Sequence, residues 1–480
     1  AVDHEFIERH TGGFEDWAAH VRAVDWDVVE TATGLTREQI TEAAEMIRAS
    51  DATIYCWAMG LTQHHNSVAT IKEVVNIALA QGNIGKRGAG LCPVRGHSNV
   101  QGDRTMGIWE KPPEAFLDSL QSEFGFDPPR EHGFDTVDAI RALRDGKAQV
   151  FVGLGGNFVQ AAPDTDVTID AMRNASLTVQ ISTKINRSHL VCGETALILP
   201  TMGRTERDIH EGVEQYVSVE DSMSSVHASR GPLDPASKHL RSEVAIVAGI
   251  AVATLGDRHS IDWDGMRADY GKIREHISRV VPGCEDFSAK VDRPGGFVLP
   301  HPPRDSRTFP TKSGLGEFVA SPIEVLQVPE GHLLLQTLRS HDQFNTTIYG
   351  NSDRYRGIHD GRRVVFIHPD DIAALGFSDG SFVDLVTRWD QDDVDRVATN
   401  FRLVAYDTPR GSAAAYYPET NPLVPLDSTA IGSNTPTSKS VVVKMLPAGT
   451  ARPATGAHSS QSEVGADDQH KSRQEPEHLS

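Results

Sequence analysis

A run of polar side chains near residue 100 is the part of the sequence best suited to binding a ligand. Glycines at positions 82, 85, 88 and 90 precede the stretch Pro93–Gly102. Its strongest hydrogen-bonding side chains are those of Arg95, His97, Ser98, Asn99 and Gln101. Glycine lets the backbone approach a ligand closely, and an arginine can hold an anion through two parallel hydrogen bonds. The pattern predicts a binding surface, with a flexible turn after a helix as the alternative.

Three further polar turns each follow a predicted strand. They are Gly153–Asn157, Ser182–Lys184 and Thr337–Thr346. The carboxyl ends of parallel strands meet at one edge of a sheet, where ligands bind in doubly wound folds. A glycine turn after a strand is common and carries little weight alone. The first two turns together predict a nucleotide-like ligand that crosses one sheet edge.

Several other catalytic motifs are excluded. The four cysteines are too far apart for a CxxC zinc ribbon, an intact cysteine-ligated iron–sulfur motif or a disulfide scaffold; they are Cys56, Cys92, Cys192 and Cys284. No Gly-x-Ser-x-Gly elbow or P-loop is present. His64 and His65 are adjacent, and we expect them to be solvated or hydrogen-bonded. We therefore expect no metal ligand in this chain.

The first two hundred residues alternate between predicted strands and helices. A buried strand is expected at 52–57 and a helix at Ser67–Ala80. The later elements are a helix at 136–145, a strand at 148–152, a helix at 165–173, and strands at 177–181 and 195–200. This alternation predicts an α/β fold with a doubly wound parallel sheet and helices on both faces.

The pattern changes to short strands after Gly331, which predicts a β-barrel-like domain. These strands are expected at 332–338, 363–368, 381–386, 400–406 and 439–445. Residues 284–330 are rich in Pro, Gly and charge and predict a surface connection, and the tail after Pro447 has too few apolar residues to fold. The predicted domains are 1–103 and 104–200 (α/β), 201–330 (mixed region and linker), 331–447 (β-barrel) and 448–480 (disordered tail).

Charge and hydropathy limit the partners and the location. The 480 residues include 46 basic and 66 acidic ones, a net charge of −20, which argues against a nucleic-acid binder. An anionic ligand must therefore be held by local basic groups and backbone amides. The longest apolar stretch, near 245–255, is too short to span a bilayer, and no signal segment opens the chain. We expect a cytoplasmic protein without a transmembrane segment.

Taken together, the ordered motifs resemble those of the molybdopterin-dependent formate dehydrogenase alpha subunits, within the dimethyl-sulfoxide-reductase superfamily, and in particular the YdeP-type branch. The resemblance covers residues 1 to about 446. The motifs are 58–63, 81–85, 93–102, 186–189, 197–200 with 203–205, and 339–346.

The resemblance implies a bis(molybdopterin guanine dinucleotide) cofactor with molybdenum or tungsten, held by α/β domains and capped by the C-terminal β-barrel. The residues that would bind it are Gly60, Gln63, Gln101, Gly156, Asn157, Gln180, Thr183, Arg339, Ser340, His341, Gln343, Asn345, Asn421, Thr435 and Lys439. Arg95 and His97 would be catalytic, with Arg95 orienting an anionic substrate. Arginines and backbone amides at strand ends suit the charge of a pyrophosphate.

Family members also carry an N-terminal segment with iron–sulfur ligands and, in many, a residue that binds molybdenum. The sequence resembles the part after that segment, so a 4Fe-4S cluster is expected only together with it. The expected function is a formate-dehydrogenase-like oxidoreductase that acts on a formate-like anion with an electron-transfer partner protein. The alternative is a non-catalytic molybdopterin-binding protein or a subunit of a split enzyme. An NAD-dependent dehydrogenase is a weaker third reading, because the full GxGxxG pattern with its acidic residue is missing.

Overall fold

The computed structural model describes residues 2–452, apart from 259 and 347. It divides into two compact units. Unit 1 contains the residues up to 162, together with 168–327 and 426–439, and unit 2 contains 163–167, 328–425 and the residues from 440 onward. Most of the disordered tail predicted for 448–480 lies outside the described residues.

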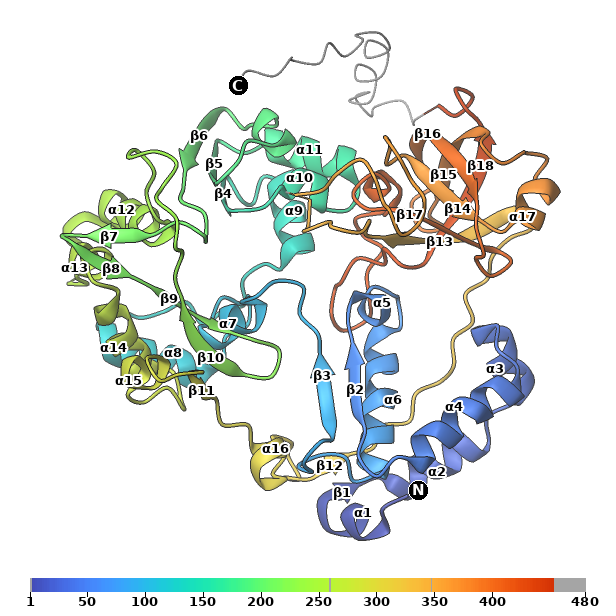
Figure 1. Ribbon diagram of the computed structural model, residues 1–480, viewed down its shortest axis with the longest axis horizontal. Coiled ribbons are helices and arrows are strands. Elements are labelled where there is room, and N and C mark those ends of the chain that lie inside the picture. The colour runs from blue at the N-terminus through green and yellow to red at the C-terminus, as the bar shows by residue number, and fades with distance from the viewer. Residues whose placement is uncertain (1, 259, 347, 453–480) are drawn as a thin grey trace, which may run out of the picture. The chain divides into compact units, whose positions relative to one another are not determined.

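A three-stranded parallel sheet lies in unit 1, in the order β4-β5-β6 (Figure 1). Its strands are β4 (Val150–Leu154), β5 (Leu177–Ser182) and β6 (Thr195–Pro200). The helices nearest to these strands in the chain are α9 (Thr136–Arg144), α10 (Phe158–Ala161) and α11 (Thr165–Arg173). The predicted parallel pairing is confirmed, whereas the doubly wound arrangement stays a prediction.

The first α/β element pairs β2 (Ile54–Trp57) with β3 (Gly90–Pro93) in parallel. Helix α6 (Ser67–Ala80) has the predicted bounds, and its Leu79 packs with Phe6 and Phe318 in a buried cluster. Strand β2 is not the buried strand that we expected, because Ile54 is 48% exposed. The other helices before β3 are α1 (His4–His10), α2 (Phe14–Arg22), α3 (Trp26–Thr33), α4 (Arg37–Ala49) and α5 (Met59–Thr62), and a short β1 (Thr11–Gly12) pairs with β12 (Gly316–Glu317).

The region 201–327 is more structured than expected. Its strands are β7 (Asp208–His210), β8 (Val213–Gln215), β9 (Val217–Glu220), β10 (Ser225–Ser229) and β11 (Phe297–Val298). Its helices are α12 (Glu243–Leu255), α13 (Trp263–Ala268), α14 (Tyr270–Val280), α15 (Phe287–Val291) and α16 (Pro302–Ser306), and α7 (Val100–Thr105) and α8 (Glu114–Phe124) precede it. The expected surface connection at 284–330 is wrong in its first part, because Cys284, Phe287, Val291 and Leu299 are buried in one cluster.

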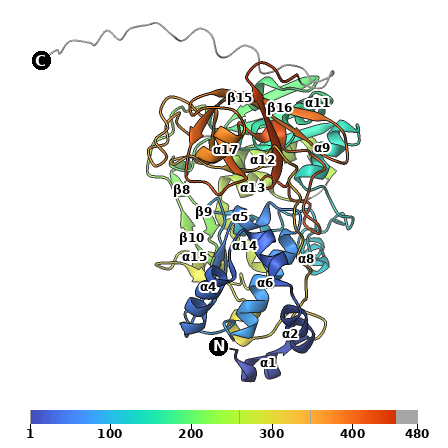
Figure 2. The ribbon, with the colours of Figure 1, turned by 90° about the vertical axis from the view of Figure 1, so that its right-hand side faces the viewer.

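Unit 2 contains a closed six-stranded barrel in the order β13-β17-β14-β16-β15-β18, which confirms the predicted barrel. Its strands are β13 (His332–Leu338), β14 (Val364–Ile367), β15 (Phe382–Arg388), β16 (Asp395–Ala405), β17 (Ser412–Tyr416) and β18 (Val441–Pro447), with helix α17 (Pro369–Ala374). β15 and β16 lie side by side in both ribbon views (Figures 1 and 2). Leu335, Leu385 and Phe401 in its core are fully buried.

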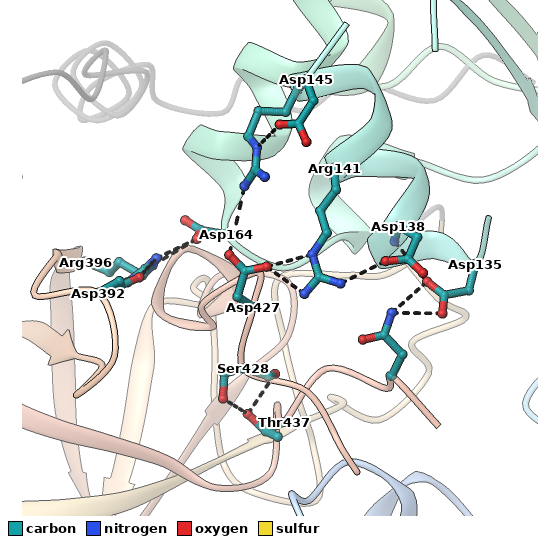
Figure 3. Close-up of polar contacts among 12 residues, drawn as sticks. Asp135, Asp138, Arg141, Asp145, Asp164, Asp392, Arg396, Asp427, Ser428 and Thr437 are labelled. Carbon is teal, nitrogen blue, oxygen red and sulfur yellow. Dashed lines mark hydrogen bonds and ion pairs between the residues drawn. The ribbon is translucent and has the colours of Figure 1, made fainter. Parts of the chain in front are cut away.

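Polar contacts connect the barrel strands to residues that lie outside them in the chain. Arg396 forms an ion pair of 2.8 Å with Asp164 and one of 2.6 Å with Asp392 (Figure 3). The backbone N–H groups of Gly449 and Ala451 donate to the fully buried carboxylate of Asp384, at 2.8 and 3.2 Å. Residues 448–451 are therefore part of the barrel, and the tail boundary predicted at 448 is too early.

Candidate functional site

Two predicted cofactor residues lie buried at the ends of β4 and β5. Asn157 and Gln180 are each 5% exposed. The side chain of Asn157 accepts a hydrogen bond of 2.6 Å from Ser188. Gln180 has no such partner: its Nε2 is buried without a hydrogen bond among the described residues, as is Oγ of Ser182. A buried unsatisfied donor is costly, so these two groups are suited to a polar ligand.

Glycines make room for these side chains. A Cβ at Gly153 would lie 3.1 Å from Oε1 of Gln180, so the residue facing Gln180 on β4 must be small. Gly155 and Gly156 both have positive φ angles, of 76° and 75°, and the Gly156 carbonyl accepts a hydrogen bond of 2.8 Å from Asn186. The turn after β4 is therefore held open at the strand ends, where the predicted Thr183 is exposed.

A cavity of about 380 Å³ lies beside these strand ends in unit 1. Gly155 and Thr183 line it together with Arg204, Arg230 and Tyr216. The Arg230 guanidinium stacks 4.8 Å from the centre of the Tyr216 ring. Burial raises the pKa of Glu243, which also lines the cavity. The sequence did not single out this cavity as a site, although Gly203-Arg204 belongs to one of the resembling motifs.

The predicted catalytic loop brings Arg95 and Gln101 together. Nε and one terminal nitrogen of Arg95 donate to Oε1 of Gln101, at 3.1 and 3.0 Å. The backbone N–H of Arg95 donates to Ser222, so a second segment of unit 1 fixes the loop. Arg95 and His97 are both exposed. The amide of Gln101 can thus orient the guanidinium while its outer face stays open to an anion.

In unit 2, Arg339 at the end of β13 is a cation without a carboxylate partner among the described residues. Its guanidinium lies 3.4 Å from the centre of the Tyr417 ring. Burial, with a smaller contribution from Arg362, lowers the pKa of Arg339, and burial raises that of Tyr417 to about 12. Arg339 is half-buried, and partial removal of a cation from water is costly unless an anion pairs with it. The geometry therefore fits an anionic group of a ligand.

Arg362, in contrast, has a carboxylate partner and several hydrogen-bond acceptors. It pairs with Glu419 at 2.7 Å and donates to Ser340 Oγ at 2.7 Å and to the Tyr417 carbonyl at 2.8 Å. Gln343 accepts from the Ser340 N–H and donates to the carbonyls of Asn345 and Tyr417. The predicted Ser340 and Gln343 thus shape the turn in which Arg339 lies. Neither Arg362 nor Tyr417 was among the residues predicted from sequence.

The remaining predicted residues of this turn lie close by in the chain. Asn345 takes a positive φ of 57°, as the sharp turn requires. His341 lies 2.8 Å from Arg354 and stacks edge-on against Tyr355. Asn421 is 2% exposed, and its side chain is hydrogen-bonded to Tyr417. Asn421 thus supports the Tyr417 side chain, whereas His341 packs against Tyr355.

The segment 426–439 brings together predicted site residues of unit 1 that are far apart in the sequence. The Lys439 N–H donates to the Gln63 carbonyl at 3.1 Å, and the Ile431 N–H donates to the His65 carbonyl at 2.9 Å. Figure 3 shows how Asp427 contacts Arg141, with the ion pair at 2.6 Å. Gly60 lies in α5, the helix that ends directly before Gln63. Thr435 lies within the segment 426–439. Gln63 and Lys439 are therefore neighbours although 376 positions separate them.

The described residues contain no group of three or more His, Cys, Asp or Glu side chains placed to hold a metal ion. No helix within these residues is long and apolar enough to cross a membrane. Within unit 1, the unsatisfied donors at the strand ends suit polar groups of a ligand. Within unit 2, the half-buried Arg339 suits an anionic group.

Comparison with known proteins agrees with this geometry. Residues 333–442 match the molydopterin dinucleotide binding domain family. The chain is 58% identical over 449 residues to an uncharacterized oxidoreductase of Mycobacterium tuberculosis, covering 93% of this chain and 58% of that protein. It is 40% identical over 451 residues to the protein YdeP of Escherichia coli, covering 93% of this chain and 59% of YdeP. The chain spans about three fifths of the length of these relatives.

A solved structure shares the fold. Acetylene hydratase from Pelobacter acetylenicus superimposes with a TM-score of 0.63 at 15% identity, over 93% of this chain and 68% of that one. The matched domain and the oxidoreductase relatives together support the molybdopterin oxidoreductase superfamily for this chain.

Proposed function

We propose that this chain forms part of a molybdopterin guanine dinucleotide-dependent oxidoreductase of the formate dehydrogenase-like type. The observation that carries the proposal is Arg339, a half-buried guanidinium without a carboxylate partner among the described residues, inside the segment that matches the dinucleotide-binding family. A pyrophosphate would supply the missing anion.

Each unit would bind a different part of the cofactor through its own residues. In unit 2, Arg339 would hold one phosphate group while Tyr417 stacks behind it. In unit 1, the unsatisfied amide of Gln180 and hydroxyl of Ser182 would bind polar atoms of a second dinucleotide. The metal of the cofactor, molybdenum or tungsten, supplies the redox chemistry when bound.

The substrate in this proposal is a small formate-like anion. Arg95 is the residue to orient it, because its guanidinium is exposed and already aligned by Gln101. His97 lies in the same exposed loop and would exchange a proton with the substrate. The iron–sulfur cluster and the electron-transfer partner belong to the same proposal, with the cluster on a segment outside this chain.

A chain that holds the cofactor without catalysis is the second candidate. The contacts of Arg339, Gln180 and Ser182 suit it equally well, whereas the exposed Arg95 loop favours the enzyme. The two candidates differ in what Arg95 does, so one pair of variants separates them.

The experiment compares Arg339→Ala with Arg95→Ala, purified from cells that make the cofactor, in complex with the portion of the mycobacterial relative that this chain does not match. Guanine nucleotide and molybdenum are measured per chain, beside turnover with an artificial electron acceptor. Loss of a charge-assisted contact of about 1.5–3 kcal/mol should lower the cofactor affinity of Arg339→Ala roughly ten- to a hundredfold. Arg95→Ala should keep the cofactor and lose turnover.

The control is Arg388→Ala, which removes an exposed barrel arginine paired with Asp395 and should change neither quantity. A complex of the unsubstituted chain that contains cofactor but shows no turnover would favour the non-catalytic candidate. Full turnover in Arg95→Ala would contradict the substrate-orienting role of Arg95. Unchanged cofactor content in Arg339→Ala would contradict the assigned binding role.

A further inference from the structure

Strand β4 presents an uncovered apolar face at a sheet edge. Val150, Val152 and Leu154 alternate along it and are 55, 51 and 53% exposed. Val179 and Ile181 on β5 lie in register with Val152 and Leu154, yet they are only 6% and 0% exposed. The same side of the sheet is therefore covered at β5 and open at β4.

The open edge lacks the features by which proteins protect such strands. Exposed edges usually carry Lys, Pro or a bulge that prevents further pairing. β4 reads Val-Phe-Val-Gly-Leu, and among the described strands it pairs with β5 alone. An additional strand would therefore find both an unpaired backbone edge and exposed apolar side chains on β4.

The other parallel sheet of unit 1 shows the same condition. β2 and β3 form a sheet of two strands, with Tyr55 and Leu91 packed against the cluster around Leu79. On the opposite face, Ile54 is 48% exposed and Cys56 is also exposed. Parallel sheets occur almost only with both faces covered, and a two-stranded sheet is marginal by itself. Two independent sheets therefore lack a layer.

The nature of the missing layer follows from the strands. A helix alone would cover the side chains of β4 but leave its edge N–H and C=O groups unpaired. A strand that continues the parallel order needs a crossover helix, and that helix would cover the open face. The fitting occupant is a polypeptide of α/β type.

We propose that the open edge of β4 and the open face of β2–β3 bind an α/β polypeptide that corresponds to the part of the relatives that this chain does not match. That part amounts to roughly two fifths of the mycobacterial relative, since the match covers 58% of it. The segment adds a parallel strand beside β4 and a helical layer over Ile54 and Cys56. This surface does not depend on the proposed cofactor.

A second copy of this chain is the rival occupant. A twofold axis would place two β4 strands antiparallel to each other, because an isologous interface pairs a surface with itself. Such a dimer would protect the β4 edge but add no helical layer over Ile54.

The test mixes this 480-residue chain with the unmatched portion of the mycobacterial relative, without cofactor. We expect a 1:1 complex by size-exclusion chromatography with light scattering, and at least tenfold slower amide exchange in both 150–154 and 54–57. Val152→Lys should weaken the complex at least tenfold. Its matched control, Val394→Lys, changes an exposed valine of unit 2 and should leave the complex unchanged.

Each other result counts against the proposal. Absence of a complex, or a complex without slower exchange in β4, overturns it, and a homodimer with slower exchange in β4 assigns the edge to a second copy. Amide exchange in α6 of unit 1, compared between Val152→Lys and the unsubstituted chain, shows whether unit 1 of that variant is folded. If it is not, the exchange data on the unsubstituted chain decide.

Discussion

The barrel of unit 2 and the parallel sheets of unit 1 differ in whether their strand edges are paired. In the barrel each strand has two neighbours, and the side chains inside it are fully buried. In unit 1, β4 and β6 have one neighbour each, and β4 exposes half of each apolar side chain on one face. The comparison teaches that apolar composition alone does not define a completed core. Four predictions concern the two units, from the largest expected effect to the smallest.

Phe401→Ala in the barrel should have the largest effect. Phe401 is 0% exposed, and truncation of a buried phenylalanine costs about 3–5 kcal/mol in the free energy of unfolding. Val152→Ala on β4 should cost less than about 1 kcal/mol in the isolated chain, since the side chain is half in water. Chemical denaturation of both variants measures the difference. Equal losses would show that β4 is as complete as the barrel.

Truncation after Pro447 should come second. It removes the Gly449 and Ala451 N–H groups from the buried Asp384 carboxylate, and unsatisfied buried acceptors cost about 1–3 kcal/mol, or more when charged. Truncation after Arg452 keeps both hydrogen bonds and is the control. Thermal unfolding of the two shortened chains should show a lower midpoint only for the first. Equal midpoints would place the barrel's end at residue 447.

Asp353→Asn should remove part of the barrel's sensitivity to acid. Burial alone would raise the pKa of Asp353, but hydrogen bonds from Arg356 and Tyr416 outweigh burial and lower it. A lowered folded-state pKa stabilises the protein above the unfolded value of about 3.9, and this stabilisation disappears as the pH falls below it toward the folded pKa.

The unfolding free energy of the variant should therefore fall less steeply below about pH 4 than that of the unsubstituted chain. At neutral pH it should be lower by about 1.5–3 kcal/mol, as expected for hydrogen bonds to a charged group. Denaturation curves at several pH values test both. An identical acid slope in variant and parent would exclude Asp353 as a source of the acid sensitivity.

Glu45→Gln on α4 should have the smallest effect. Glu45 pairs with Arg48 at 2.6 Å, but both side chains are more than half exposed, and exposed ion pairs contribute little to stability. A change in unfolding midpoint near the detection limit is expected, and it should vanish at high salt. A loss as large as that of Asp353→Asn would mean that α4 packs against a further surface.

Local patterns predicted many elements correctly. Helix α6 has the predicted bounds. At α4, Thr36 and Gln39 form the capping box that a Thr followed three residues later by a Gln favours. Strand β17 was missed because its core is Ala413–Ala415, and alanine favours helices. Burial of Cys284 and Phe287 was missed as well, because a stretch rich in Pro, Gly and charge gave no periodic signal around them.

The site was only partly accessible from the sequence. Arg339 and Arg95 stood in recognisable polar turns, after a strand or between glycines. Gln180 lies inside the predicted strand 177–181 and was named only through the family resemblance. Tyr417 and Arg362 come from elsewhere in the barrel, and only closure of the strands brings them beside β13. Their roles depend on tertiary contacts, which no local pattern contains.

The 426–439 segment has a consequence for the order of events during synthesis. His65 and Gln63 leave the ribosome more than 360 residues before Ile431 and Lys439, their backbone partners. Contacts of such long sequence separation form late, and growing chains fold in the order in which they are made. The loop after α5 must therefore wait, without these partners, until almost the whole barrel has been translated. A chaperone that acts on this nascent chain would meet α5 and α6 in that waiting state.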